Sequence, residues 1–181
     1  MKELKESKIG VEMKSMKLNK IVVYMVVALL MAEASSASVI KERIVKAFND
    51  FNGKNLDLIE DFYADNIVFV DPIAEQKGMS EVKKYYSKIY TNVQSIKFDF
   101  ISLVEENGQV FGSWKMVFRA KGLNDGKEVS TFGSSHFKYN KETMKVYYHR
   151  DYYDMGEFIY QHIPVLSYVI KKVNKRLEGH E

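Results

Sequence analysis

FYADNIVFVDPIAEQKGMSEVKKYY, residues 62–86, carries the clearest structural pattern of this sequence. The apolar run at residues 67–70 is typical of a β-strand, and it ends at the turn-forming pair Asp71-Pro72. Ser80 is a candidate N-cap for a helix. After Ser80, apolar and aromatic residues recur at helical spacing: Val82, Tyr85, Tyr86, Ile89 and Tyr90. The stretch therefore predicts a strand, a loop and an amphipathic helix.

The flanking sequence extends this pattern in both directions. Upstream, Ile40, Ile44, Phe48 and Phe51 predict a helix over about 39–52, and a second short helix follows at 55–64. Downstream, long alternating runs predict four strands at 95–106, 109–122, 127–140 and 144–154. Turn residues at 106–108, 124–126 and 140–141 favour antiparallel connections. We expect an α+β fold, in which a cone-shaped, curved antiparallel sheet wraps three N-terminal helices and an extra C-terminal helix follows.

Three segments resemble a known superfamily. The stretch 62–86 resembles the part of ketosteroid isomerases and SnoaL-like proteins in which a helix ends in aromatic-Ala-Asp and a strand ends in Asp-Pro. GSSHFKY at 133–139 and YYHRDYYD at 147–154 resemble later strands of the same nuclear-transport-factor-two-like superfamily. The resemblance covers about residues 40–155. It implies a cone with a pocket for a small apolar molecule, in a bacterial subgroup without a settled activity.

The same resemblance places the isomerase general base on Asp71. The acidic donor position of the isomerases falls on Ser135, and their first-helix tyrosine falls near Ala47 or Phe48, so both strong oxyanion donors are missing. Losing one such donor typically costs about 10²–10³ in rate, which argues against steroid isomerisation by that mechanism. The alternative role for Asp71 is a turn residue that caps the end of the strand.

The last expected strand concentrates polar side chains. Because strand side chains alternate, His149, Asp151 and Tyr153 share one face with Tyr147. A histidine and a carboxylate two residues apart on one face can hydrogen-bond and move a proton. The alternative is a buried pair that only holds the strand to the first helix. The candidate catalytic residues are accordingly Asp71, His149 and Asp151.

Large residues of the central strands are candidates for the pocket wall, with plain core packing as the alternative. The expected ligand-pocket residues are Phe48, Trp114, Met116, Phe118, Ser135, Phe137 and Tyr153. We expect the cone to bind a small hydrophobic molecule, with a carbonyl-bearing one as an option, and isomerase-, cyclase- or hydrolase-type proton transfer as the accompanying chemistry. The alternative is a non-catalytic ligand-binding or dimeric interaction module, and the exposed side of the sheet around His136 predicts a homodimer.

Composition excludes several other classes of function. The formal charge is +3, and residues 1–38 hold six lysines and four glutamates, which leaves the remainder at only +1. A nearly neutral domain has no basic face for a phosphate backbone, so we expect no nucleic-acid partner. Cysteine is absent, and no histidine spacing indicates a metal site. Nucleotide-binding and α/β-hydrolase motifs are also missing, so no cofactor is expected.

The chain divides into three expected parts: a leader at 1–38, the cone domain at 39–154 and a C-terminal amphipathic helix at 155–181. Within the leader, residues 16–37 place Lys17 and Lys20 before an apolar run and then small residues, the layout of a signal peptide. This predicts export to a periplasmic or secreted location, with an uncleaved membrane anchor or a buried first helix as the alternatives. The C-terminal helix is expected to close the cone or to meet a partner subunit, and membrane contact is the less favoured role.

Overall fold

The computed structural model describes residues 2–179, and it describes side-chain surroundings from Lys20 onward. Met1 and residues 180–181, which belong to the expected leader and C-terminal helix, lie outside the described residues. The elements in chain order are α1 (Lys2–Asp50), α2 (Leu58–Phe62), β1 (Tyr63–Val70), β2 (Glu75–Lys77), α3 (Met79–Tyr90), β3 (Val93–Glu106), β4 (Gln109–Ala120), η1 (Asn124–Gly126), β5 (Val129–Tyr139), β6 (Val146–Tyr153), α4 (Met155–Phe158), η2 (Tyr160–His162) and α5 (Pro164–Leu177).

The chain forms two compact units, Met1–Val39 and Ile40–Glu181. Helix α1 runs through the boundary, so the helix expected from about residue 39 continues upstream without a break. From Ile40 onward the buried apolar residues of this helix are Ile40, Ile44, Ala47 and Phe48, whereas the apolar run at 21–31 is exposed. The segment Lys20–Asp50 is long and apolar enough to cross a membrane, a test that signal sequences also pass. The N-terminal helix is therefore compatible with either a signal sequence or an anchor.

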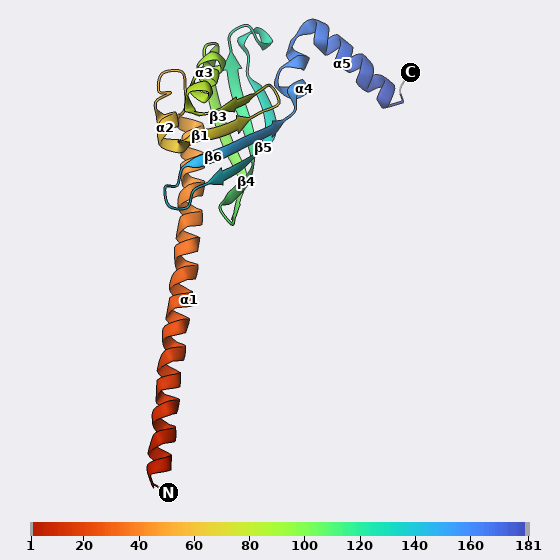
Figure 1. The fold of residues 1–181 in the computed structure, drawn as a ribbon. Helices are drawn as coiled ribbons and strands as arrows, with labels where there is room; N and C mark the ends of the chain where they lie inside the picture. The colour runs from red at the N-terminus through yellow and green to blue at the C-terminus, as the bar shows by residue number, and fades with distance from the viewer. Residues whose placement is uncertain (1, 180–181) are drawn as a thin grey trace. The chain divides into compact units, whose positions relative to one another are not determined.

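One six-stranded sheet forms the framework, in the order β2-β1-β6-β5-β4-β3 (Figure 1). The expected antiparallel connections from β3 to β6 are confirmed. The structure departs from the all-antiparallel expectation at β1, which pairs in parallel with β6. Adjacent strands joined by turns run antiparallel by necessity, but β1 meets β6 across a long stretch of chain and is free of that constraint. Strand β2, a three-residue antiparallel partner of β1, was not expected from the sequence.

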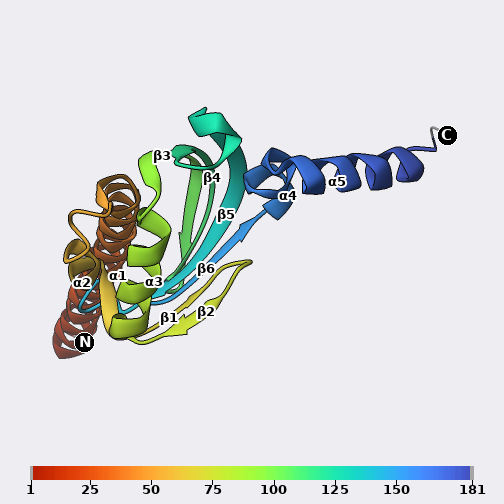
Figure 2. The ribbon, with the colours of Figure 1, turned by 90° about the horizontal axis from the view of Figure 1, so that it is seen from above.

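The sheet curves around α3, as Figure 2 shows. Helix α3 contacts both β1 and β3, although three strands separate these two in the sheet. Its buried residues are Val82 and Tyr90, at the helical spacing read from the sequence. The main core lies between this concave face and the helices, and it includes Ile40, Ile44 and Phe137. The expected α+β cone around three N-terminal helices is confirmed.

A bulge in β6 changes the expected alternation at one position. The register shifts where Lys138 pairs with Tyr148 and Tyr139 pairs with Val146. The extra residue between them, Tyr147, is 40% exposed instead of sharing the inner face. Beyond the bulge, alternation holds, because His149 is fully buried and Arg150 is exposed.

The C-terminal segment consists of the short helices α4 and η2 and the longer helix α5. Asp154 caps α4 by accepting hydrogen bonds from the backbone N–H groups of Gly156 and Glu157. Phe158 of α4 packs against Phe118 and Tyr153 at ring-centroid distances of 4.9 and 5.0 Å, which covers one end of the sheet's inner face. Pro164 begins α5, where a missing N–H costs nothing, and α5 has no buried residue.

Candidate functional site

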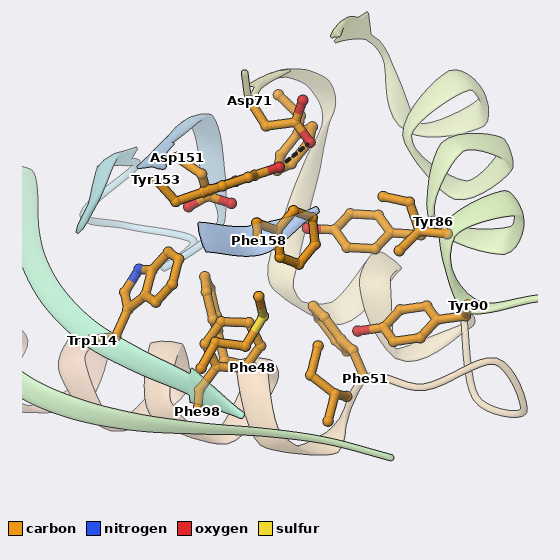
Figure 3. A pocket seen from close by; sticks show the side chains of 14 residues that line it. Phe48, Phe51, Asp71, Tyr86, Tyr90, Phe98, Trp114, Asp151, Tyr153 and Phe158 are labelled. Carbon is orange, nitrogen blue, oxygen red and sulfur yellow. Dashed lines mark hydrogen bonds between the residues drawn. The ribbon is translucent and has the colours of Figure 1, made fainter. Parts of the chain in front are cut away.

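An aromatic cavity of about 90 Å³ lies on the concave side of the sheet. Its fourteen lining residues come from α1 and the segment after it (Phe48, Phe51), β1 and its end (Phe69, Asp71), α3 (Tyr86, Ile89, Tyr90), β3 (Ile96, Phe98), β4 (Trp114, Met116), β6 (Asp151, Tyr153) and α4 (Phe158). Figure 3 shows the aromatic side chains around the space, with the two carboxylates on one side of it. Helices and strands therefore hold every lining group except Phe51 and Asp71.

Asp71 lies where β1 ends, and both of its carboxylate oxygens are engaged. Oδ1 accepts hydrogen bonds from the backbone N–H groups of Ile73 and Ala74, both at 2.8 Å. Oδ2 accepts from the Tyr85 hydroxyl at 2.6 Å and from the Tyr153 hydroxyl at 3.5 Å. This is the turn-capping geometry of an Asp-Pro pair, with hydrogen bonds from two tyrosine hydroxyls added.

Two side chains of the sheet, Ser135 and His149, hydrogen-bond to one carboxylate oxygen of Asp151. The Ser135 hydroxyl donates to Asp151 Oδ1 at 2.5 Å, and Ser135 Oγ in turn accepts from the indole N–H of Trp114 at 2.8 Å. His149 Nε2 lies 2.8 Å from the same carboxylate oxygen. Among the described residues, Asp151 Oδ2 has no hydrogen-bond donor, so one oxygen of this carboxylate remains open to the cavity.

His149 connects this carboxylate to two tyrosines through the core. The ring is fully buried and stacks on Phe137 at a centroid distance of 4.4 Å. Nδ1 lies 2.6 Å from the Tyr63 hydroxyl, which lies 3.2 Å from the hydroxyl of Tyr86. A carboxylate beside Nε2 requires a proton on that nitrogen, so in the neutral ring Nδ1 accepts from Tyr63. Tyr63 then accepts from Tyr86, and the chain of hydrogen bonds ends at the cavity wall.

Burial keeps the tyrosines of this site protonated. It raises the pKa of Tyr63 and of Tyr86 well above 10, and it raises the pKa of Tyr90 to about 12. The pKa of Tyr153 is also raised, first by burial and then by the charge of Asp71. These side chains are therefore neutral hydroxyl groups at physiological pH. Tyr90 is nine-tenths buried, and its hydroxyl has no hydrogen-bond partner among the described residues.

The described residues contain no group of three or more His, Asp or Glu side chains placed to hold a metal ion. The polar groups of the cavity are two carboxylates and three tyrosine hydroxyls. Their chemistry is that of hydrogen bonding, ion pairing and proton acceptance.

A family model described as SnoaL-like domain matches residues 44–149, more than half of the chain. The chain belongs to this family. No curated protein sequence matches this SnoaL-like chain significantly.

Solved structures share the SnoaL-like fold at low sequence identity. A Shewanella denitrificans protein assigned as a SnoaL-like polyketide cyclase is 15% identical with a TM-score of 0.58, over 67% of this chain and 93% of that one. A Catenulispora acidiphila protein with a ketosteroid isomerase-like fold, in complex with trimethylamine, is 14% identical with a TM-score of 0.56, over 68% and 90% of the two chains. TerC, co-crystallised with polyporic acid, is 12% identical with a TM-score of 0.56, over 66% and 94%.

In this SnoaL-like domain, the structure brings together only part of the residues proposed from sequence. Those that line the cavity are Asp71, Asp151, Phe48, Trp114, Met116 and Tyr153. His149 lies behind the wall, where it contacts Asp151 but not the cavity. Phe118 and Phe137 are core residues, and Ser135 reaches the site only through its hydrogen bonds.

Sequence reasoning missed most of the aromatic wall. The missed lining residues are Phe51, Phe69, Tyr86, Ile89, Tyr90, Ile96, Phe98 and Phe158. Tyr86 and Tyr90 were identified as one helix face, and the alternation of β3 places Ile96 and Phe98 on one strand face, so both signals were present. The sequence did not indicate that these faces of α3 and β3 meet across the same cavity.

Proposed function

We propose that this SnoaL-like domain binds a small, largely apolar organic molecule in the aromatic cavity, with Asp151 as its polar contact. The observation that carries the proposal is the asymmetry between the two carboxylates of the wall. Asp71 accepts four hydrogen bonds, whereas Asp151 is fixed at one oxygen and open at the other. An orienting polar group in an otherwise apolar cavity is the usual composition of a small-molecule site.

The size of the cavity limits the ligand. About 90 Å³ is somewhat less than the roughly 150 Å³ of an engineered apolar cavity that binds benzene. A ligand of a few non-hydrogen atoms, or one ring, matches this space. The trimethylamine and polyporic acid complexes of proteins with the same fold support a role in holding small organic molecules.

Trp114 provides a direct binding assay, because it is the chain's single tryptophan and lies in the cavity wall. Titration with cyclopentanone and with 3,3-dimethylbutan-1-ol should change its fluorescence saturably. Ile89→Phe should abolish this response by filling the cavity. Ile101→Phe is the matched control, because Ile101 is 65% exposed and outside the lining. Loss of the response in both variants, or no saturable response in the wild type, would contradict the proposal.

A second candidate function is proton transfer on the bound molecule. The open oxygen of Asp151 can accept a proton from carbon next to a carbonyl, while Ser135 and His149 hold the other oxygen. Exchange of the α-protons of cyclopentanone with D₂O, followed by NMR, tests this. We expect Asp151→Asn to lower the exchange rate by about 10²-fold or more and Asp71→Asn to lower it less. An equal rate in wild type and Asp151→Asn would leave only the binding function.

We also propose that the domain pairs through the outer face of the sheet. Large apolar side chains exposed there include Phe111 (53%), Phe132 (57%) and Tyr152 (46%). A twofold dimer would bury this face. Sedimentation should give twice the chain mass for the wild type and the monomer mass for Phe111→Asp, and a wild-type monomer at high concentration would contradict this.

For the N-terminal helix we propose a signal sequence that directs export. The support is the layout of lysines, apolar residues and small residues between 16 and 37, together with the exposure of the apolar run. Mass spectrometry of the protein from its native host should find a soluble chain that begins near Ser35 or Ser38. A membrane-bound, full-length chain would instead indicate an anchor.

A further inference from the structure

The cavity wall carries negative charge without any basic side chain. Nine of its fourteen residues are aromatic, two are carboxylates, and none is Lys, Arg or His. Neither Asp71 nor Asp151 forms an ion pair with a lysine or arginine in the described part of the chain, and Asp151 is hydrogen-bonded by Ser135 and His149. Two carboxylates bordering an apolar cavity make a site of negative potential.

Two of the three tyrosine hydroxyls in the wall have their protons engaged by other side chains of the protein. Tyr153 donates a hydrogen bond to Asp71, and Tyr86 donates one to Tyr63, whose own hydroxyl donates to Nδ1 of His149. Their oxygens are left as acceptors toward a ligand. The charges also act on Tyr153, whose pKa is raised by burial and further by Asp71 and Asp151.

Tyr90 offers the cavity a hydroxyl group that no described residue engages. Its side chain is nine-tenths buried, stacks on Tyr86 at a centroid distance of 6.0 Å and directs its hydroxyl toward the cavity (Figure 3). No described residue hydrogen-bonds to that hydroxyl. The Tyr90 hydroxyl keeps accessible surface and lines the cavity, so it is free to hydrogen-bond with a ligand there.

We propose that the ligand is a small organic ammonium ion, a protonated amine or quaternary ammonium group with short apolar substituents. Aromatic faces attract such cations, and enclosures of Trp, Tyr and Phe are a recurrent solution for binding them. Asp151 Oδ2 supplies the counter-charge, and Tyr90 can accept from an N–H group where the amine has one. The inference rests on the proposed binding function and specifies its ligand class.

An anion fits this wall poorly, and a neutral molecule gains less from it than a cation does. An anion would meet two carboxylates and no basic lining residue. The electrostatic repulsion would be larger in this apolar cavity than in water because the dielectric constant is lower. A neutral carbonyl oxygen would find Tyr90 as the one lining hydroxyl whose proton is not already engaged. A cation matches both the charge and the aromatic surface.

The test compares choline with its neutral isostere 3,3-dimethylbutan-1-ol, which has the same shape without the charge. Both are titrated against Trp114 fluorescence in phosphate buffer, because Tris is itself an amine. We expect choline to bind at least about tenfold more tightly. Equal affinities would overturn the ammonium assignment and leave the proposed binding function standing. If neither compound binds, both the assignment and the proposed function fail.

Variants locate the effect at Asp151. Asp151→Asn keeps the side-chain shape and removes the charge, so choline affinity should fall about tenfold while that of the neutral alcohol stays the same. The control is Asp99→Asn, an exposed aspartate paired with Lys97 outside the cavity. Circular dichroism verifies that Asp151→Asn is folded. If it is not, Tyr90→Phe serves as the second variant. Because Tyr90→Phe removes only a hydroxyl, it should leave the preference for choline over the neutral alcohol intact. Unchanged choline affinity in folded Asp151→Asn, or lost selectivity in Tyr90→Phe, would overturn the assignment.

Discussion

Gly133 should be irreplaceable because the Trp114 indole lies directly on it. The two residues are register partners on β5 and β4, and the indole continues along β5 to donate its N–H to Ser135 Oγ at 2.8 Å. A Cβ atom on residue 133 would lie 2.2 Å from Trp114 Cη2, 2.5 Å from Cζ2 and 2.7 Å from Cζ3. Ordinary carbon contacts begin near 3.5 Å, so Gly133→Ala requires the ring to move by more than about 1 Å.

The cost follows from two losses. Overpacking of this kind costs about 1–3 kcal/mol, and the displaced indole loses a hydrogen bond worth about 0.5–1.5 kcal/mol. We therefore expect Gly133→Ala to lower the free energy of unfolding by about 2–4 kcal/mol. In a Trp114→Leu background the obstructing ring is gone, and alanine should stabilise the strand over glycine by about 0.5–1 kcal/mol.

Urea unfolding followed by circular dichroism measures all four chains of this double-mutant cycle. The expected coupling energy between positions 133 and 114 is about 2.5–5 kcal/mol, the cost in the wild type added to the gain in the Trp114→Leu background. Ser134→Ala, one residue along on the outer face, is the control and should change stability by less than about 0.5 kcal/mol. If Gly133→Ala cost the same in both backgrounds, the close contact with the indole would not be its cause.

Three further predictions concern the hydrogen-bonded core and the end of the sheet. Tyr63→Phe leaves the buried Nδ1 of His149 without its donor and should cost about 1–3 kcal/mol in urea unfolding, whereas Tyr148→Phe on the outer face should cost almost nothing. Folding raises the pKa of Tyr90 to about 12, so the folded protein keeps a proton that the unfolded chain releases near pH 10. The free energy of unfolding should therefore fall as the pH rises from 10 to 12. A urea midpoint that does not change over this pH range would contradict this prediction. Asp154→Ala removes the α4 cap and should lower stability by about 1 kcal/mol, and an unchanged thermal midpoint would show that the cap does not hold Phe158 in place.

Local patterns predicted much of the fold because each depends on neighbours in sequence. The apolar run before Asp71-Pro72 became β1, and the periodic aromatics behind Ser80 became the buried face of α3. Turn residues between the later strands specified antiparallel neighbours, since a short turn leaves no other geometry. Alternation also placed His149 and Asp151 on one strand face, and the structure joins them at 2.8 Å.

The composition of the site was decided by contacts between segments far apart in the chain. Parallel pairing of β1 with β6 brings Tyr63 to within 2.6 Å of His149, 86 residues later, and no local pattern specifies that pairing. The same packing buries His149 behind the wall and leaves one oxygen of Asp151 open, whereas local turn geometry and Tyr85 occupy Asp71. Sequence alone determined which residue types were available to the cavity. Only the tertiary structure decided which of them face it, because burial and hydrogen-bond partners are properties of the packed chain.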